Sequence, residues 1–154
     1  MPPKINPVPE GYHSVIPYLC VKGADQALEF YKRAFGAVEI MRMPAPNAKV
    51  GHAEIKIGDS HIMIADEFPD LGFRSPKALG GSPVGILLYV ENADKTVAQA
   101  VAAGAKVVRE VKNQFYGDRS GTIEDPFGHS WYVSTHIEDV PFEELKKRAA
   151  EDCK

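Results

Sequence analysis

Short stretches of alternating apolar and polar residues predict strands, and a stripe of helical period interrupts them early in the chain. The stripe is one face of a helix that Gly36 ends, and it comprises Ala24, Ala27, Leu28, Tyr31, Ala34 and Phe35. Strands are predicted around this helix at residues 13–21, 38–43, 51–57 and 60–65. The last two form a hairpin whose two-residue turn is Gly58-Asp59. The first part of the chain therefore has the order βαβββ.

The same order of elements returns in the second part of the chain. A strand at 85–90 precedes a helix whose apolar face comprises Ala93, Val97, Ala100 and Val101, and a strand at 106–111 follows it. The segment 116–136 supplies the last two strands, joined at Asp125-Pro126-Phe127-Gly128. The repeated order predicts an internal duplication.

Five segments follow from this duplication. Residues 1–10 are a Pro-rich leader, 11–66 the first βαβββ module, 67–83 a linker rich in Pro and Gly, 84–139 the second module, and 140–154 a C-terminal helix. The predicted fold class is α+β, with two tandem modules.

Composition narrows the range of partners. The 154 residues carry a net charge of -3 and scattered basic residues, which is not the pattern of a nucleic-acid-binding protein. No apolar run approaches the ~18 residues of a membrane span. The two cysteines, Cys20 and Cys153, form no CxxC motif, which is typical of a reducing compartment. We therefore expect a cytoplasmic protein with a small-molecule partner.

The motif GDRSGT followed by DPFGH, within a duplicated βαβββ chain, resembles the vicinal oxygen chelate superfamily of glyoxalases, bleomycin resistance proteins and extradiol dioxygenases. Four segments are similar to its PhnB-like branch: GYHSVIPYL, ALEFYKRAFGA, HAEIKIGDSHIMIADE and QFYGDRSGTIEDPFGH. The resemblance covers residues 11–139. It implies a curved mixed sheet with helices on its convex face, and a homodimer. Function is less constrained, because this fold supports isomerases, dioxygenases, transferases and drug-sequestering proteins.

The resemblance also implies a divalent metal, held by His, Gln or Glu on the first and last strand of each module. Counting along the strands places Ile16, Met63, Gly85 and Tyr132 at those four positions. None of these residues is a good ligand for such an ion, so we expect no metal there and no other cofactor. An atypical metal site made of His52, Glu54 and His61 is the alternative.

The alternation of the strands selects the residues that face the concave side. Glu54 is predicted opposite Met63, and a four-residue turn at 125–128 puts Arg119 on the same face as Tyr132. Glu54 as general base and Arg119 as oxyanion stabiliser are the candidate catalytic residues. The candidate ligand-binding residues are Tyr18, His52, Met63, Tyr89 and Tyr132. The structural alternatives are an ion pair between Glu54 and Arg119, a hydrogen-bonded core histidine and cavity-filling tyrosines.

Two hypotheses remain. One is a protein that binds a small organic molecule in its concave cleft without the usual metal site. The other is an enzyme, either a lyase, isomerase or dioxygenase with an atypical metal site or one that uses Glu54 and Arg119 directly.

Overall fold

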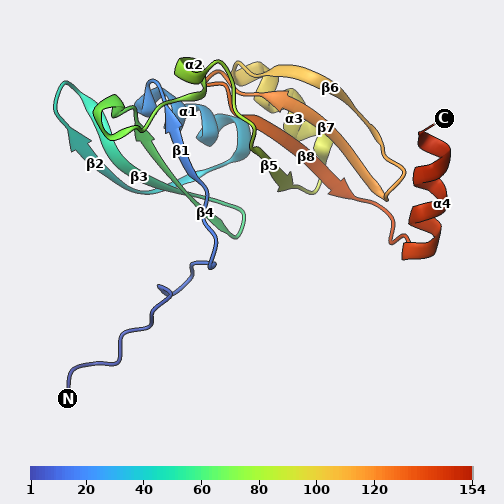
Figure 1. The fold of residues 1–154 in the computed structure, drawn as a ribbon, viewed down its shortest axis with the longest axis horizontal. Coiled ribbons are helices and arrows are strands. Elements are labelled where there is room, and N and C mark those ends of the chain that lie inside the picture. Colours follow the sequence, from blue (N-terminus) through green and yellow to red (C-terminus); the bar gives the residue numbers. More distant parts are fainter. Residues whose placement is uncertain (154) are drawn as a thin grey trace. The chain divides into compact units, whose positions relative to one another are not determined.

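The computed structural model describes residues 1–153, which divide into two compact units at Leu79 and Gly80 (Figure 1). Each unit contains one four-stranded sheet with a helix packed on one face. The α+β fold of two tandem modules is therefore confirmed. Lys154, the last residue of the predicted helical segment 140–154, lies outside the described residues.

The first unit follows the predicted βαβββ order. Its elements are β1 (Tyr18–Val21), α1 (Ala24–Phe35), β2 (Val38–Ala45), β3 (Lys49–Ile57) and β4 (Ser60–Asp66). The sheet order is β1-β4-β3-β2, with β1 parallel to β4 and the other pairs antiparallel. The buried side chains of α1 are those of the predicted apolar stripe, apart from the half-buried Phe35 and the addition of Phe30.

The second unit repeats this arrangement. Its elements are β5 (Gly85–Tyr89), α3 (Ala93–Ala103), β6 (Lys106–Asn113), β7 (Asp118–Glu124), β8 (Ser130–His136) and α4 (Phe142–Asp152). The order β5-β8-β7-β6, with β5 parallel to β8, is the order of the first sheet.

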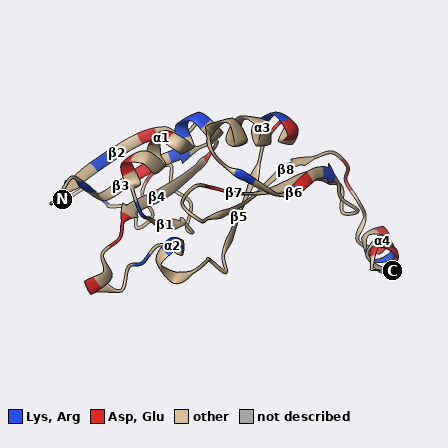
Figure 2. Ribbon diagram, turned by 90° about the horizontal axis from the view of Figure 1, so that it is seen from above, with Lys and Arg blue, Asp and Glu red and all other residues tan. Residues whose placement is uncertain are grey.

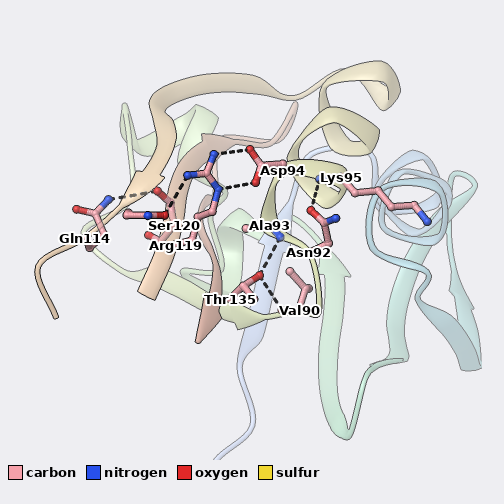
Figure 3. Close-up of polar contacts among 10 residues, drawn as sticks. Val90, Asn92, Ala93, Asp94, Lys95, Gln114, Arg119, Ser120 and Thr135 are labelled. Carbon is pink, nitrogen blue, oxygen red and sulfur yellow. Dashed lines mark hydrogen bonds and ion pairs between the residues drawn. The ribbon is translucent and has the colours of Figure 1, made fainter. Parts of the chain in front are cut away.

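The helices α1 and α3 each begin beside a side chain of the last strand of their unit in chain order, which accepts hydrogen bonds from the start of the helix. In the first unit, Asp66 Oδ1 accepts hydrogen bonds from the backbone N–H groups of Gly23 and Ala24, at 3.0 and 2.9 Å. In the second, Thr135 Oγ1 accepts one from Ala93 at 2.8 Å (Figure 3). These bonds satisfy N–H groups that have no partner inside the helix and tie each helix to its sheet.

The first strand is shorter than predicted, because it begins at Tyr18 rather than at residue 13, and Val15 is exposed. Pro17 has no N–H to donate, although its carbonyl accepts from Met63. The segment 67–83, predicted to be a linker, contains a short 3-10 helix (η1, Pro69–Leu71) and the one-turn helix α2 (Pro76–Leu79).

The turn between β7 and β8 is also longer than predicted. The last ladder pair is Glu124 with Ser130, so five residues separate the strands rather than four. Asp125 builds this turn, because its Oδ1 accepts from the backbone N–H groups of Phe127 and His129 and its Oδ2 from the indole of Trp131. The extra residue shifts the register of the second hairpin by one position.

Charged residues of both signs are interspersed along the elements, and α4 carries both (Figure 2). None of the helices formed by residues 1–153 is long and apolar enough to span a membrane.

Candidate functional site

The face of the first sheet that points away from α1 carries most of the predicted site. One row of cross-strand neighbours runs over all four strands, comprising Tyr18, Met63, Glu54 and Met41. Met43 and His52 form a neighbouring pair on the same face. We refer to this surface, with Tyr18, Met41, Met43, His52, Glu54 and Met63, as the open face of the first unit. The predicted pairing of Glu54 with Met63 is confirmed.

A chain of hydrogen bonds crosses this open face. Tyr18 Oη lies 2.6 Å from His52 Nδ1, and His52 Nε2 lies 3.1 Å from Glu54 Oε1. Because a carboxylate only accepts, Nε2 carries a hydrogen, and in a neutral imidazole Nδ1 accepts the hydrogen of Tyr18. The second Glu54 oxygen accepts from the hydroxyl of Tyr12. Four side chains are therefore linked in the order Tyr18, His52, Glu54, Tyr12.

Two members of this chain, Glu54 and Tyr18, differ in exposure. Glu54 is only 8% exposed, whereas Tyr18 is 47% exposed. The hydrogen bond from Tyr12 has the largest influence on Glu54 and lowers its pKa; burial opposes this effect and the bond from His52 adds to it. Desolvation, followed by the charge of Glu54, raises the pKa of Tyr18. The chain thus joins a buried carboxylate to an exposed, protonated phenol.

Tyr12 was not among the predicted site residues, although it completes the chain. Its ring stacks on His61 with the ring centroids 4.0 Å apart. Tyr12 lies before the first strand, where no periodic pattern assigns a face to a side chain. The sequence shows it only as an aromatic residue beside a Pro-rich leader, within the GYHSVIPYL segment, and neither feature points to its role.

Cys20 lies beside this site, on β1. Its side chain is buried, and burial raises the pKa of the thiol to about 11. The thiol is therefore protonated at neutral pH and is a poor nucleophile.

The corresponding face of the second sheet has a different set of side chains. Tyr132 lies opposite Thr122 and next to Leu87, while Tyr89 is paired with Ser134. We call this surface, with Leu87, Tyr89, Thr122, Tyr132 and Ser134, the open face of the second unit. Both predicted tyrosines lie on it, and both are more than 40% exposed.

Tyr89 is part of a polar cluster at one end of this face. Its hydroxyl donates to Asp118 Oδ2 at 2.8 Å, and His136 Nδ1 lies 2.8 Å from Asp118 Oδ1. His136 Nε2 contacts Asp139 at 2.7 Å. Asp139 and then Asp118 raise the pKa of His136 through these hydrogen bonds.

The predicted position of Arg119 is wrong. Because of the longer turn, Arg119 pairs with Thr135 and points to the face that carries α3, not to that of Tyr132. Its guanidinium makes a two-pronged ion pair with Asp94 of α3, at 2.6 and 2.9 Å, and also donates to Asn113 (Figure 3). The geometric basis for an oxyanion-stabilising role is therefore lost. The polar partners of Arg119 and Glu54 belong to the same unit as each of these residues: Asp94 for Arg119 and His52 for Glu54.

The residues at the usual metal-ligand positions do not suit a divalent ion. They provide an aliphatic chain at Ile16, a thioether at Met63, no side chain at Gly85 and a phenol at Tyr132. The ring of Tyr132 also occupies the space beside Gly85, since a Cβ built on Gly85 would lie 2.2 Å from Tyr132 Cε2. A side chain at position 85 would therefore require the ring of Tyr132 to move.

The alternative metal site is not assembled either. Within residues 1–153, no group of three or more His, Cys, Asp or Glu side chains is arranged to hold a metal ion. His61 lies opposite Lys56 rather than Glu54, and Tyr12 covers its ring. Both nitrogens of His52 are already within hydrogen-bond distance of Tyr18 and Glu54.

A cavity of about 260 Å³ lies elsewhere in the first unit, at the N-terminus of α1. Lys22, Lys49 and Asp66 are among the residues that line it. Asp66 already accepts the nearby N–H groups of Gly23, Ala24 and Val50, so these donors are not available to a ligand. None of the candidate site residues lines this cavity.

The sequences of two relatives align with more than two thirds of this chain. An uncharacterized protein of Mycobacterium tuberculosis is 40% identical over 133 residues, which is 84% of this chain and 78% of the relative. An uncharacterized protein of Arabidopsis thaliana is 33% identical over 112 residues, or 68% of this chain and 67% of the relative.

Two solved structures have a fold similar to that of this chain. The X-ray structure of an Arabidopsis thaliana gene product has a TM-score of 0.65 and 31% identity, covering 80% of this chain and 98% of that one. A Bacillus cereus structure described as a putative 3-demethylubiquinone-9 3-methyltransferase, PhnB protein, has a TM-score of 0.61 at 16% identity, covering 80% and 99%. The latter similarity concerns the fold alone.

The sequence profile of one family matches residues 12–133, which span both units. The chain therefore belongs to the Glyoxalase/Bleomycin resistance protein/Dioxygenase superfamily.

Proposed function

We propose that this protein binds a small organic molecule on the open face of the first unit, without the metal site usual in its superfamily. The observation that supports this proposal most strongly is the combination of exposed apolar side chains with a buried, hydrogen-bonded carboxylate. Tyr18, Met41 and Met43 are all more than 35% exposed, next to Glu54 at 8%. Ligand sites in proteins combine apolar contact area with a few well-placed polar groups in this way.

The chemistry of the apolar residues favours a flat or flexible organic ligand. Methionine side chains are unbranched and polarisable, so they adapt to ligands of different shape and make favourable contacts with aromatic rings. Met41 and Met43 on β2 and Met63 on β4 lie on either side of His52 and Glu54 of β3. The exposed hydroxyl of Tyr18 and the imidazole of His52 would then orient the ligand.

The open face of the second unit is a second proposed ligand-binding surface. Tyr89 and Tyr132 are exposed there beside Leu87, with the hydroxyl of Ser134 on the same face. Membership of the PhnB-like branch, a homodimeric assembly and a cytoplasmic location are further parts of the proposal, and they rest on the motifs and composition of the sequence.

A fluorescent amphipathic aromatic, 8-anilinonaphthalene-1-sulfonate, tests the proposal. We expect it to bind the folded protein with increased fluorescence, and we expect Met43→Asp to weaken binding at least about tenfold, since a charge replaces apolar contact area. Leu71→Asp, at a fully exposed position of η1, is the control that should bind as the unchanged protein does. Equal binding by the two variants, or none by the unchanged protein, would contradict the proposal.

An enzymatic function is the second candidate. The hydrogen bonds of Glu54 change the role that this residue would have in it. Both oxygens of Glu54 already accept hydrogen bonds, and its pKa is lowered, so the carboxylate itself is a weak base. Any proton transfer by Glu54 would therefore pass through His52. If the protein turns over a substrate, Glu54→Gln should abolish turnover and leave binding intact, and unchanged turnover would exclude this role.

A further inference from the structure

The exposed end of the hydrogen-bonded chain is a hydroxyl, which can accept one hydrogen bond while it donates another. Tyr18 Oη donates to His52 Nδ1 at 2.6 Å when the imidazole is neutral, and its lone pairs remain available to a ligand. The ring of Tyr18 is fixed in place by an edge-to-face contact with Phe73, with centroids 5.5 Å apart. The hydroxyl is therefore held in one position at the surface.

The buried carboxylate of the chain can stabilise a proton that arrives at His52. Glu54 Oε1 faces His52 Nε2 at 3.1 Å, and a hydrogen bond between an imidazolium and a carboxylate is stronger than one between neutral groups. Tyr12 donates to the other carboxylate oxygen and keeps the carboxylate ionised. The remaining titratable groups that face this chain are His61, which Tyr12 covers, and Cys20, whose thiol is protonated.

We propose that Glu54, His52 and Tyr18 form a proton relay that takes a proton from the weakly acidic hydroxyl of a bound phenol or enol. This inference rests on the proposed function, because it assigns a ligand class to the open face of the first unit. Tyr18 is the residue that touches the ligand, and His52 and Glu54 are positioning residues behind it.

The proton transfer balances without any further reactant. The O–H bond of the ligand breaks and its proton goes to Tyr18 Oη, while the phenolic proton of Tyr18 goes to His52 Nδ1. The ligand becomes a phenolate or enolate, and His52 becomes an imidazolium whose charge faces Glu54. Tyr18 is neutral before and after the transfer, which agrees with its raised pKa. The methionines of the open face would hold the planar body of such a ligand.

The chromogenic phenol 4-nitrophenol tests the relay, because its phenolate absorbs at a longer wavelength than the phenol. At the pH at which free 4-nitrophenol is half ionised, we expect about nine tenths of the bound molecules to be ionised, a tenfold change in the ionisation constant. Equilibrium dialysis measures binding and the absorbance spectrum measures ionisation. In each of the variants Tyr18→Phe, His52→Gln and Glu54→Gln, the ionised fraction of the bound 4-nitrophenol should return to about one half.

Tyr116→Phe is the matched control, since it removes an exposed tyrosine hydroxyl from a residue that belongs to neither open face. It should retain the excess ionisation, and thermal melting should show that all variants are folded. If 4-nitrophenol binds without excess ionisation, or if Tyr116→Phe abolishes that excess, the relay is wrong. Failure of 4-nitrophenol to bind, with binding of 8-anilinonaphthalene-1-sulfonate intact, overturns the ligand class alone. Loss of binding of the sulfonate as well contradicts the proposed function itself.

Discussion

The two units have the same strand order and the same helix placement, yet their open faces carry different chemistry. In the first unit the partner of Met63 on the central strand is Glu54, part of a chain that also includes His52 and Tyr18. In the second, the partner of Tyr132 at the corresponding position is the hydroxyl residue Thr122. One βαβββ scaffold thus carries a Tyr-His-Glu chain on one sheet and, on the other, exposed tyrosines beside a cluster of Asp118 and His136. This difference is possible because the side chains of an open face are not part of the core.

The largest expected difference between the units lies in their turns and cores. Trp131→Ala should lower the free energy of unfolding by roughly 3–5 kcal/mol, because it leaves a large cavity and removes the indole donor of Asp125. Ile62→Ala, at the corresponding strand position of the first unit, should cost less, about 2–4 kcal/mol, since no polar partner is lost. Urea denaturation measures both, and an equal or larger loss for Ile62→Ala would contradict the role assigned to the Asp125 turn.

A smaller difference is expected at the helix caps. Asp66→Ala should destabilise the protein by roughly 2–4 kcal/mol, because Asp66 accepts from three backbone N–H groups, including that of Val50 at 2.7 Å. Thr135→Val should cost only about 1–2 kcal/mol, since Thr135 accepts from Ala93 alone and Asn92 also caps α3. Thermal and chemical denaturation rank the two variants, and a larger loss for Thr135→Val would reverse this comparison.

The smallest expected difference concerns how the stability of the two units depends on pH, because the contributions of Glu54 and His136 have opposite signs. The pKa of Glu54 is lowered in the folded protein, so the stability that it contributes is present at neutral pH and is lost as the pH falls through that value. The pKa of His136 is raised, so its contribution is present below about pH 6.5 and is lost as the pH rises through the folded-state value. The two networks should therefore weaken at opposite ends of the pH range.

Melting temperatures of Glu54→Gln and His136→Gln, each compared with the unchanged protein, measure this contrast. The difference for Glu54→Gln should shrink on acidification and that for His136→Gln on alkalinisation. Salt should reduce the His136 difference in particular, because its ion pair with Asp139 is exposed. Differences that change in the same direction for both variants would show that the networks are not the source of the pH dependence.

The success of the sequence-based predictions differs between the two hairpins for a physical reason. The two-residue turn Gly58-Asp59 determines the register of β3 and β4, so the pairing of Glu54 with Met63 followed from counting residues. The register of β7 and β8 depends instead on Asp125, whose carboxylate accepts two backbone N–H groups and lengthens the turn. Turn residues at DPFG do not reveal that side-chain contribution, and Arg119 was consequently assigned to the wrong face.

The sequence by itself determined the duplication, the helix of each module with most of its buried face, and most of the strands. These features depend on local periodicity and on the identity of single residues. The tertiary structure alone decided which polar groups meet: Tyr12 reaches Glu54 across 42 residues, and Arg119 reaches Asp94 across 25. Such partners are set by the packing of distant segments, for which a periodic pattern contains no information. The hydrogen-bonded chain of Tyr18, His52 and Glu54 is therefore a property of the fold, built from residues that the sequence could only place on one face.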